Sequence, residues 1–327
     1  MTKLTRRAIV LSAAAAGAAY GLDGRLAFMP SALAQGVAGA SPMNPKGLQF
    51  HTFKVGDIDV TTVFDGAIYR DHSAGFIKNA SIEEQKASLR AAGLPDDRIP
   101  NTYTITIVRT GGKTIMFDAG NEAGRDPNTA KLRENMLAAG IEPAKLDAIV
   151  VTHFHPDHIF GLMTGQNEQV YANTQIIVPE SEYAYWSDPG VIAKLPQARQ
   201  GIAKRVQATM PSWKNLARHD GKGDVIAGIR AVATPGHTPG HTSYLMGSGA
   251  AQLMVLGDVT SIPAMNLKNP GWHVMFDQDA QVAEATRRRV FDQAVTDKTI
   301  MTGYHWGMPG AGTIQKDGAG YALVPVA

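Results

Sequence analysis

Short apolar runs rich in β-branched residues recur along the chain, each bounded by charged or turn-forming residues. They lie at residues 58–64, 103–108, 114–117, 148–152, 175–178, 229–233, 243–246 and 252–256. The run at 103–108 alternates polar and apolar positions, and Gly111-Gly112 supplies a hairpin turn into the run at 114–117. The run at 148–152 is apolar almost throughout, which indicates a buried strand. The pattern predicts a strand at each of these places.

Four longer segments predict helices, at residues 81–93, 129–139, 181–210 and 278–296. Ser81 is a good capping residue before an acidic first turn, while Gly93 and Gly140 end the first two segments. No segment repeats, and no Pro- or Ser-rich linker divides the chain. We therefore expect one domain of strands and helices over residues 50–327.

The first 34 residues have the pattern of an export signal. A basic start with Arg6-Arg7 precedes an apolar run at 8–19, and Ala32-Leu33-Ala34 offers a cleavage site. The run is shorter than the roughly 20 residues that span a bilayer. The arginine pair favours twin-arginine export over an ordinary secretory signal. Either route predicts a bacterial periplasmic or secreted protein, with residues 35–49 as a flexible arm.

Charge and cysteine content restrict the partners and the ligands. Removal of residues 1–34 takes away four basic and one acidic residue from totals of 31 and 29, which leaves a net charge of −1. This balance gives no reason to expect nucleic acid or a membrane as partner, and we interpret the Arg287–Arg289 run as a solvated face or ion-pair set. A homodimer is compatible with the sequence. The chain has no cysteine, so any metal site uses nitrogen and oxygen ligands.

A cluster of candidate ligands follows the buried run at 148–152. It reads His153-Phe154-His155-Pro156-Asp157-His158. Side chains two apart on an extended backbone point the same way, so His153 and His155 can share one metal ion. Pro156 turns the chain, and Asp157 and His158 then suit a second ion. An accidental cluster in a polar loop is the alternative, but polar groups beside a buried strand need partners.

This motif resembles the signature of the metallo-β-lactamase superfamily, whose fold is an αββα sandwich of two mixed β-sheets with helices outside. The resemblance implies further ligands after later strands, and His237, Asp258 and His305 stand in the expected order. It assigns His153, His155 and His237 to one metal and Asp157, His158 and His305 to the other, with Asp258 bridging both.

The resemblance also implies a chemistry. Two Zn²⁺ ions, or other divalent metals, would hold a bridging hydroxide that attacks an ester-type bond, and Asp157 could carry the proton to the leaving group. Asp118, in an Asp-x-Gly sequence, is expected either to order the site or to complete a turn. His241 is expected either to hydrogen-bond near the ligands or to be structural.

Among superfamily members, the whole chain is most similar to the methyl parathion hydrolase group, in length, ligand spacing and the Phe276-Asp-Gln-Asp sequence. The expected substrate is a small aryl ester, lactone or organophosphate triester. Trp186, Trp272 and Trp306 are candidate pocket walls, although Trp186 could equally be helix packing. No aromatic residue lies between Asp118 and Leu137, where that group has a phenylalanine wall. We therefore expect weak phosphotriester turnover.

Other members of the superfamily supply the alternatives. Quorum-quenching acyl-homoserine lactonases carry a tyrosine where this chain has Ser261. Glyoxalase II-type thioesterases hold glutathione with basic residues, and the sequence shows no basic cluster next to the ligands. A mononuclear iron enzyme resembling persulfide dioxygenases retains the same ligand types. A non-catalytic metal-binding protein is a further alternative, although no ligand is missing.

Overall fold

The computed structural model describes residues 43–226, 228–248 and 250–327. The expected export signal and the first part of the expected arm lie outside these residues. Within them the strands form two seven-stranded sheets. The first sheet contains, in order, β1 (Phe50–Val55), β2 (Ile58–Arg70), β3 (Ile99–Thr110), β4 (Lys113–Phe117), β5 (Ala148–Val150), β6 (Gln175–Pro179) and β7 (Leu216–His219).

The second sheet runs in the reverse order, from β14 (Gly320–Pro325) through β13 (Ala311–Asp317), β12 (Ile300–Thr302), β11 (Ala251–Val255), β10 (Thr242–Ser248) and β9 (Ile229–Ala233) to β8 (Asp224–Ile226). Both sheets are mixed. Strands β4 to β7 are parallel, as are β11 and β12, while the hairpins at the other ends are antiparallel.

Successive side chains along a strand point to opposite faces of the sheet and so pack into two different apolar layers. In β4, Ile115 and Phe117 pack between the sheets, whereas Met116 packs under the helices of the first sheet. In β11, Leu253 packs between the sheets and Met254 faces the helix α7 (Ala280–Asp297). A strand buried on both faces needs apolar residues at successive positions, which explains the continuous apolar runs in the sequence.

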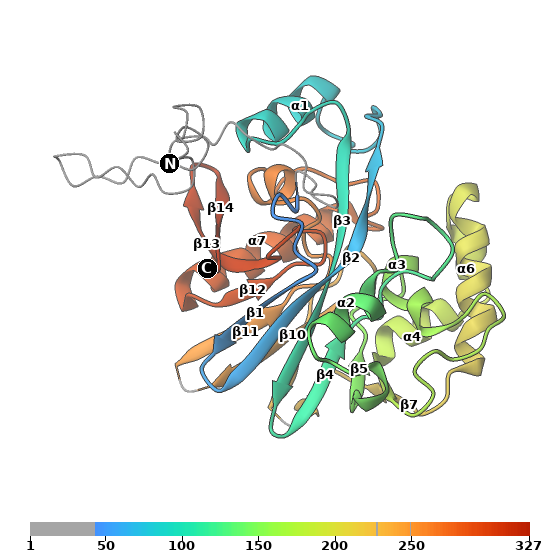
Figure 1. Cartoon of the computed structure of the whole chain (residues 1–327). Coiled ribbons are helices and arrows are strands. Elements are labelled where there is room, and N and C mark those ends of the chain that lie inside the picture. The colour runs from blue at the N-terminus through green and yellow to red at the C-terminus, as the bar shows by residue number, and fades with distance from the viewer. Residues whose placement is uncertain (1–42, 227, 249) are drawn as a thin grey trace, which may run out of the picture. The chain divides into compact units, whose positions relative to one another are not determined.

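The remaining helices cover the first sheet or its ends (Figure 1). They are α1 (Ile82–Ala91), α2 (Leu132–Ala138), α3 (Pro156–Ile159), α4 (Glu180–Ser187), α5 (Val191–Lys194) and α6 (Gln197–Thr209). Short turns of helix lie at η1 (Pro143–Lys145), η2 (Phe160–Leu162), η3 (Met210–Ser212) and η4 (Pro263–Leu267). Helices outside two facing sheets make the αββα sandwich that the sequence predicts.

Two expected elements differ from the structure. The single helix expected over 181–210 is divided into α4, α5, α6 and η3, because Pro189-Gly190 and Pro196 interrupt it. The described part of the expected arm, residues 43–49, is not loose. Asn44 is buried and exchanges side-chain hydrogen bonds with the main chain of Leu48, and the Met43 carbonyl accepts from the Met308 amide.

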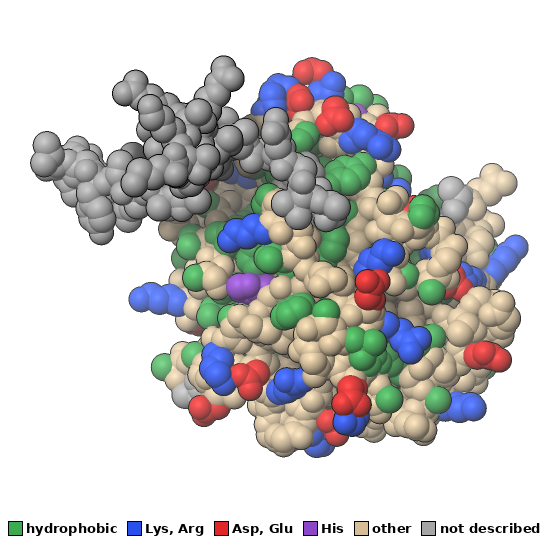
Figure 2. Space-filling view, viewed as in Figure 1, with side chains coloured by type: hydrophobic (Ala, Val, Ile, Leu, Met, Phe, Trp, Pro, Cys, Tyr) green, Lys and Arg blue, Asp and Glu red, His purple; other side chains and the backbone are tan. Residues whose placement is uncertain are grey.

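The surface and the helices bear on the expected partners. On the face seen in Figure 2, basic and acidic side chains are intermixed, without a continuous patch of one sign. No described helix has both the length and the apolar character needed to cross a membrane. The arginine run on α7 is mixed in role: Arg287 is buried, Arg288 pairs with Glu284, and Arg289 donates to the Ala233 carbonyl.

Candidate metal centre

The His-x-His-x-Asp-His segment lies where β5 ends. The backbone of His155 is extended, and Pro156 then begins α3, where its missing amide hydrogen costs little. His153 and His155 therefore precede the helix, while Asp157 and His158 project from its first turn. The change of backbone direction separates the four side chains into two pairs.

The other predicted ligands also follow strands. His237 lies in the loop after β9, Asp258 after β11, and His305 after β12. The loop with His237 is pressed between two helices, and its glycines allow this approach. A Cβ on Gly240 would lie 2.2 Å from the amide nitrogen of Glu182 on α4, and Gly236 lies as close to Ala283 on α7.

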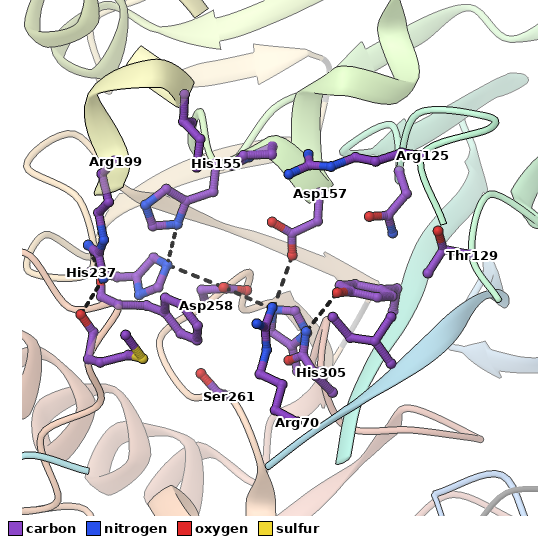
Figure 3. Close-up of a pocket in the computed structure, with 18 of the residues that line it drawn as sticks. Arg70, Arg125, Thr129, His155, Asp157, Arg199, His237, Asp258, Ser261 and His305 are labelled. Atoms are coloured by element: carbon purple, nitrogen blue, oxygen red, sulfur yellow. Dashed lines mark hydrogen bonds and ion pairs between the residues drawn. The ribbon is translucent and has the colours of Figure 1, made fainter. Parts of the chain in front are cut away.

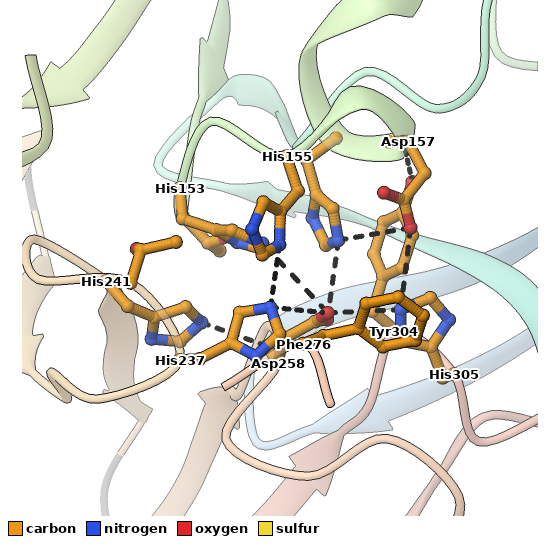
Figure 4. A network of polar contacts seen from close by, with 12 residues as sticks. His153, His155, Asp157, His237, His241, Asp258, Phe276, Tyr304 and His305 are labelled. Atoms are coloured by element: carbon orange, nitrogen blue, oxygen red, sulfur yellow. Dashed lines mark hydrogen bonds and ion pairs between the residues drawn. The ribbon is translucent and has the colours of Figure 1, made fainter. Parts of the chain in front are cut away.

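The structure brings all seven predicted ligands together in two groups (Figure 4). Within each group the candidate ligand atoms lie within 4.8 Å of one another. The first group holds His153, His155, His237 and Asp258, and the second holds Asp157, His158 and His305.

Asp258 touches both groups. Its Oδ2 lies 3.3 Å from His237 Nε2 and 3.1 Å from His305 Nε2, and its Oδ1 lies 3.3 Å from His158 Nε2. Asp157 Oδ2 lies 3.5 Å from His305 Nε2 on the far side of the second group. One carboxylate is thus shared between the two sets of imidazoles, as a bridging ligand requires.

The donor set fits two divalent ions. Three buried atoms that face this centre, His153 Nε2, His158 Nε2 and Asp258 Oδ1, have no hydrogen-bond partner among the residues that the structure describes. His155 Nδ1 and His237 Nε2 lie 2.8 Å from each other. Either one of these two nitrogens carries a proton and donates it to the other, or both face a cation. Buried polar atoms without partners are costly, and imidazole and carboxylate ligands suit zinc.

The charges of the buried side chains also indicate that the centre binds cations. Burial opposes a charge on His237, but Asp258 and Asp277 outweigh it and raise its pKa to about 9. Burial also opposes a charge on His158, whose pKa is nevertheless raised by Asp258 and Asp118. Burial and the neighbouring imidazoles lower the pKa of His153. The carboxylates therefore demand nearby positive charge, which bound cations can supply in place of protons.

Asp118 orders this centre. It is buried with a left-handed φ of 64°, and its carboxylate accepts from the Thr152 amide and hydroxyl and contacts His158 Nδ1 at 2.8 Å. His158 is thereby turned so that its Nε2 faces Asp258. Asp118 has this ordering position as well as a place in a turn.

His241 holds the backbone of Asp258. Its Nε2 accepts from the Asp258 amide at 2.9 Å, and its Nδ1 contacts the hydroxyl and carbonyl of Thr234. Burial, and then the neighbouring His237, lower the pKa of His241 to about 3, which keeps the acceptor nitrogen unprotonated. The sequence alone had left open whether His241 forms a hydrogen bond near the ligands or is structural.

Sequence reasoning missed the buried pair of Asp277 and Arg287. Asp277 contacts His237 Nδ1 at 2.9 Å with one oxygen and accepts from Arg287 at 3.1 Å with the other. Arg287 also donates to the carbonyl of Val259, next to Asp258. Its place in a run of three arginines on a helix hid this role, although the Phe276-Asp-Gln-Asp sequence had marked the segment.

Glu182 on α4 is a second missed residue. It is fully buried and accepts four hydrogen bonds, from the Phe154 and Gly240 amides, the Thr238 hydroxyl and the Trp186 indole. These donors belong to the segment with His153 and His155 and to the loop with His237. One carboxylate therefore joins the two segments that supply the first group of ligands.

A cavity of about 510 Å³ opens over the ligands. Trp186 lines it, yet this side chain is also almost completely buried in the core under the first sheet. The other two expected wall residues are not among the residues that line the cavity. Trp306 is buried against α7 in the layer of the second sheet, and Trp272 packs near α1. Both expectations were wrong, because spacing in sequence gave no information on which face of the sandwich they occupy.

The cavity also corrects the expectation that no basic cluster lies near the ligands. Arg70, Arg125 and Arg199 line it from three sides, as Figure 3 shows. They come from the end of β2, the loop after β4 and helix α6. Since these segments are far apart in sequence, only the fold brings the three side chains together.

Known proteins share this sequence pattern and this fold. The model of the metallo-beta-lactamase superfamily matches residues 96–295. An N-acyl homoserine lactonase from a Bacillus species is 26% identical over 162 residues, which cover 50% of this chain and 56% of the lactonase. The chain thus matches little more than half the length of this relative.

Two solved structures extend the similarity to almost the whole fold. AidC, a dizinc quorum-quenching lactonase solved with the product N-hexanoyl-L-homoserine, is 25% identical with a TM-score of 0.80, over 85% of this chain and 97% of AidC. The hydrolase AbOPH is 22% identical with a TM-score of 0.79, over 86% and 98%. Because the family model covers more than half of the chain and the ligand pattern is complete, this protein belongs to the metallo-β-lactamase superfamily.

Proposed function

We propose that this protein is a dinuclear metal-dependent hydrolase that cleaves ester-type bonds, with two Zn²⁺ ions per chain. The observation that carries the proposal is the position of Asp258, whose carboxylate is in contact with ligands of both groups at the floor of the cavity. A protein that stores or senses one ion has no need of a second, adjacent group open to a cavity.

When bound, the two ions supply a Lewis acid and a water whose pKa is lowered to about 7. The residues of the chain have separate tasks around them. Asp258, in contact with ligands of both groups, would offset the repulsion between the two cations. Asp157, which is 22% exposed at the cavity wall, is placed to pass a proton between the reacting centre and the solvent.

The cavity favours carboxylic esters and lactones over phosphotriesters. Its apolar lining includes Ile68, Trp186 and Phe276, which can contact an acyl chain or an aromatic ring. The loop after β4, however, contributes Asn121 and Thr129 where the methyl parathion hydrolase group has an aromatic wall. We expect phosphotriesters to be turned over measurably, but less well than aryl esters.

Hydrolysis of acyl-homoserine lactones is a second candidate. The similarity to a Bacillus N-acyl homoserine lactonase and to AidC favours it. Ser261 lines the cavity at the position where such lactonases carry a tyrosine, so the hydroxyl that grips the lactone carbonyl would have to come from elsewhere. Tyr103, which lines the same cavity beside His305, carries a phenol that could take this place.

A panel of aryl esters, lactones and phosphotriesters, assayed on one preparation of known metal content, tests the proposal. We expect aryl esters and aryl lactones to be the best substrates. A strong preference for acyl-homoserine lactones would establish the second candidate. One redox-active iron per chain without hydrolysis would indicate an oxygenase of the persulfide dioxygenase type instead.

The variant Asp258→Ala should lose the second metal ion and nearly all hydrolysis. Retention of both ions and of full turnover in this variant would refute the bridging role.

A further inference from the structure

The three arginines of the cavity lack acidic partners. Among the described residues, no ion pair joins Arg70, Arg125 or Arg199 to a carboxylate, although many arginines on the rest of the surface are paired. A guanidinium is always charged at neutral pH and is suited to binding a carboxylate with two parallel hydrogen bonds. Three such groups around one cavity are therefore candidates for binding an anion.

Arg70 and Arg199 converge on one aromatic ring. Their guanidinium carbons lie 5.6 Å and 5.7 Å from the centre of Phe276, which also lines the cavity. Arg199 is held in place, since it donates to the carbonyls of Met275 and Phe276. Two like charges near one ring repel each other, so an anion close to both would lower the energy of the arrangement.

Arg125 stands in a loop whose position is fixed by a buried carboxylate. Asp65 accepts from the amide and the side chain of Asn121 and from the amide of Leu132, which tie both ends of the loop to β2. The guanidinium of Arg125 lies near the ring of Phe160, and Figure 3 shows it on the side of Asp157. This loop thus presents a cation where a related group of enzymes presents an aromatic wall.

The acidic residues of the cavity do not cancel these charges. Three aspartates line it, and two of them, Asp157 and Asp258, belong to the metal groups. The third, Asp126, accepts from the Asn128 amide and has no ion pair with an arginine in the described part of the chain. With cations in the ligand groups, the cavity as a whole is positive and would attract an anion.

We propose that the substrate is an ester that carries a second, negatively charged group, a carboxylate, bound by Arg70 and Arg199 in the part of the cavity lined by Phe276, with Arg125 adding to the attraction. The inference rests on the proposed ester hydrolysis and specifies its substrate class. The apolar lining formed by Ile68, Leu195 and Ile202 would contact the carbon skeleton between the ester and the carboxylate.

Two esters with the same leaving group test this assignment: mono-4-nitrophenyl suberate and its terminal amide. The wild-type holoenzyme should have a KM for the carboxylate ester about tenfold below that for the amide, as one or two charge-assisted hydrogen bonds allow. Arg70→Gln and Arg199→Gln should each remove most of this difference, measured as the ratio of the two KM values within each variant. Raising the salt concentration should weaken the preference.

Arg230→Gln is the matched control, because Arg230 is an exposed arginine on β9 outside the cavity lining. It should leave both KM values unchanged. Arg70 is exposed, so Arg70→Gln should fold even if Arg199→Gln does not. Equal KM values for the two esters in the wild type, or a preference that persists in the arginine variants, would overturn the inference.

A binding experiment separates this inference from the proposed activity. 4-Phenoxybutanoate and 4-phenoxybutanamide contain no ester, and their affinities for the holoprotein can be compared by calorimetry. Tighter binding of the carboxylate that is lost in Arg70→Gln and Arg199→Gln supports the anion site even if no ester is hydrolysed, in which case only the proposed function fails. Carboxylate binding that does not depend on the arginines overturns the inference, whatever the activity.

Discussion

Each of the three histidines that contact the Asp258 carboxylate has its Nδ1 at a particular acceptor, which leaves its Nε2 facing the centre. An imidazole that donates from Nδ1 presents an unprotonated Nε2 to a metal, so such acceptors set both tautomer and ring orientation. The acceptors are Asp118 for His158, Asp277 for His237, and the Thr102 carbonyl for His305.

The contact between Asp277 and His237 gives a first prediction. Asp277→Ala should weaken metal binding about 10- to 100-fold, because His237 loses the acceptor that orients it and Arg287 is left buried without its partner. Titration with zinc against a competing chelator measures the change. Asp97→Ala, an exposed aspartate elsewhere, should bind zinc as the wild type does. Unaltered affinity in Asp277→Ala would mean that His237 needs no orienting partner.

At this scale the sequence predicted the candidate ligands but not their supports. The seven ligands share a spacing motif that can be seen in one dimension. The supports are buried side chains that contact segments 28 or more residues away in sequence, namely Glu182, Asp277 and Arg287. Neither their burial nor these distant contacts can be recognised from the residues next to them in sequence.

Among the elements, α4 joins the two segments that carry the first group of ligands. Glu182→Ala should lower the free energy of unfolding by about 3–5 kcal/mol, because four buried donors lose their acceptor. Denaturant unfolding measures this loss. Glu180→Ala is the control on the same helix: Glu180 is 46% exposed in its ion pair with Arg218, and its loss should cost less than about 1 kcal/mol. Similar losses in both variants would contradict the joining role of Glu182.

Asp65 on β2, which holds the loop after β4, gives a prediction that depends on pH. Burial raises the pKa of Asp65 from 3.8 to about 6, even though hydrogen bonds from Asn121 and Leu132 lower it. The folded state therefore holds this proton more tightly than the unfolded state. Its contribution to stability is present below about pH 4 and is lost as the pH rises through about 6.

Asp65→Asn cannot ionise and should lack this component. Relative to the variant, the wild type should lose on the order of 3 kcal/mol of unfolding free energy between pH 4 and pH 7. Unfolding of both proteins in the same buffers, at the same metal content, measures the difference. Parallel pH profiles for the two proteins would show that Asp65 keeps its ordinary pKa.

Element boundaries were predicted where the chain carries a local signal. Ser81 caps α1 as expected, and its hydroxyl accepts from the Glu84 amide. The break of the expected helix at 181–210 also had a signal, since Pro189 and Pro196 lie inside it, but the length of the segment obscured it. The strands β13 and β14 were missed, because Lys316 and Asp317 make the pattern polar at an edge hairpin.

For the whole molecule, the predicted αββα fold came from the motif and its resemblance, and strand patterns alone would not have divided the strands between two sheets. What the sequence could not give is which side chains face the cavity. Trp186 and the three arginines face it, and Trp272 and Trp306 do not, because this depends on how distant segments pack. The substrate class that we infer follows from that three-dimensional arrangement.

Metal binding should contribute to the stability of the domain as a whole. Removal of the ions by a chelator should lower Tm by about 10 °C. Metal ions at a free concentration about 1,000 times their Kd contribute about 4 kcal/mol to the free energy of unfolding, and each kcal/mol shifts Tm by about 2–4 °C. Scanning calorimetry before and after addition of excess zinc measures the loss and its recovery. An unchanged Tm would indicate that the folded domain is equally stable without bound cations.

The metal content of the purified wild-type protein, measured by native mass spectrometry together with elemental analysis, tests the central claim most directly. The seven ligands in two groups that share Asp258 predict two divalent ions per chain, with zinc as the principal metal. A chain that binds no ion at all, or only one redox-active iron, would contradict the dinuclear hydrolase proposed for this site.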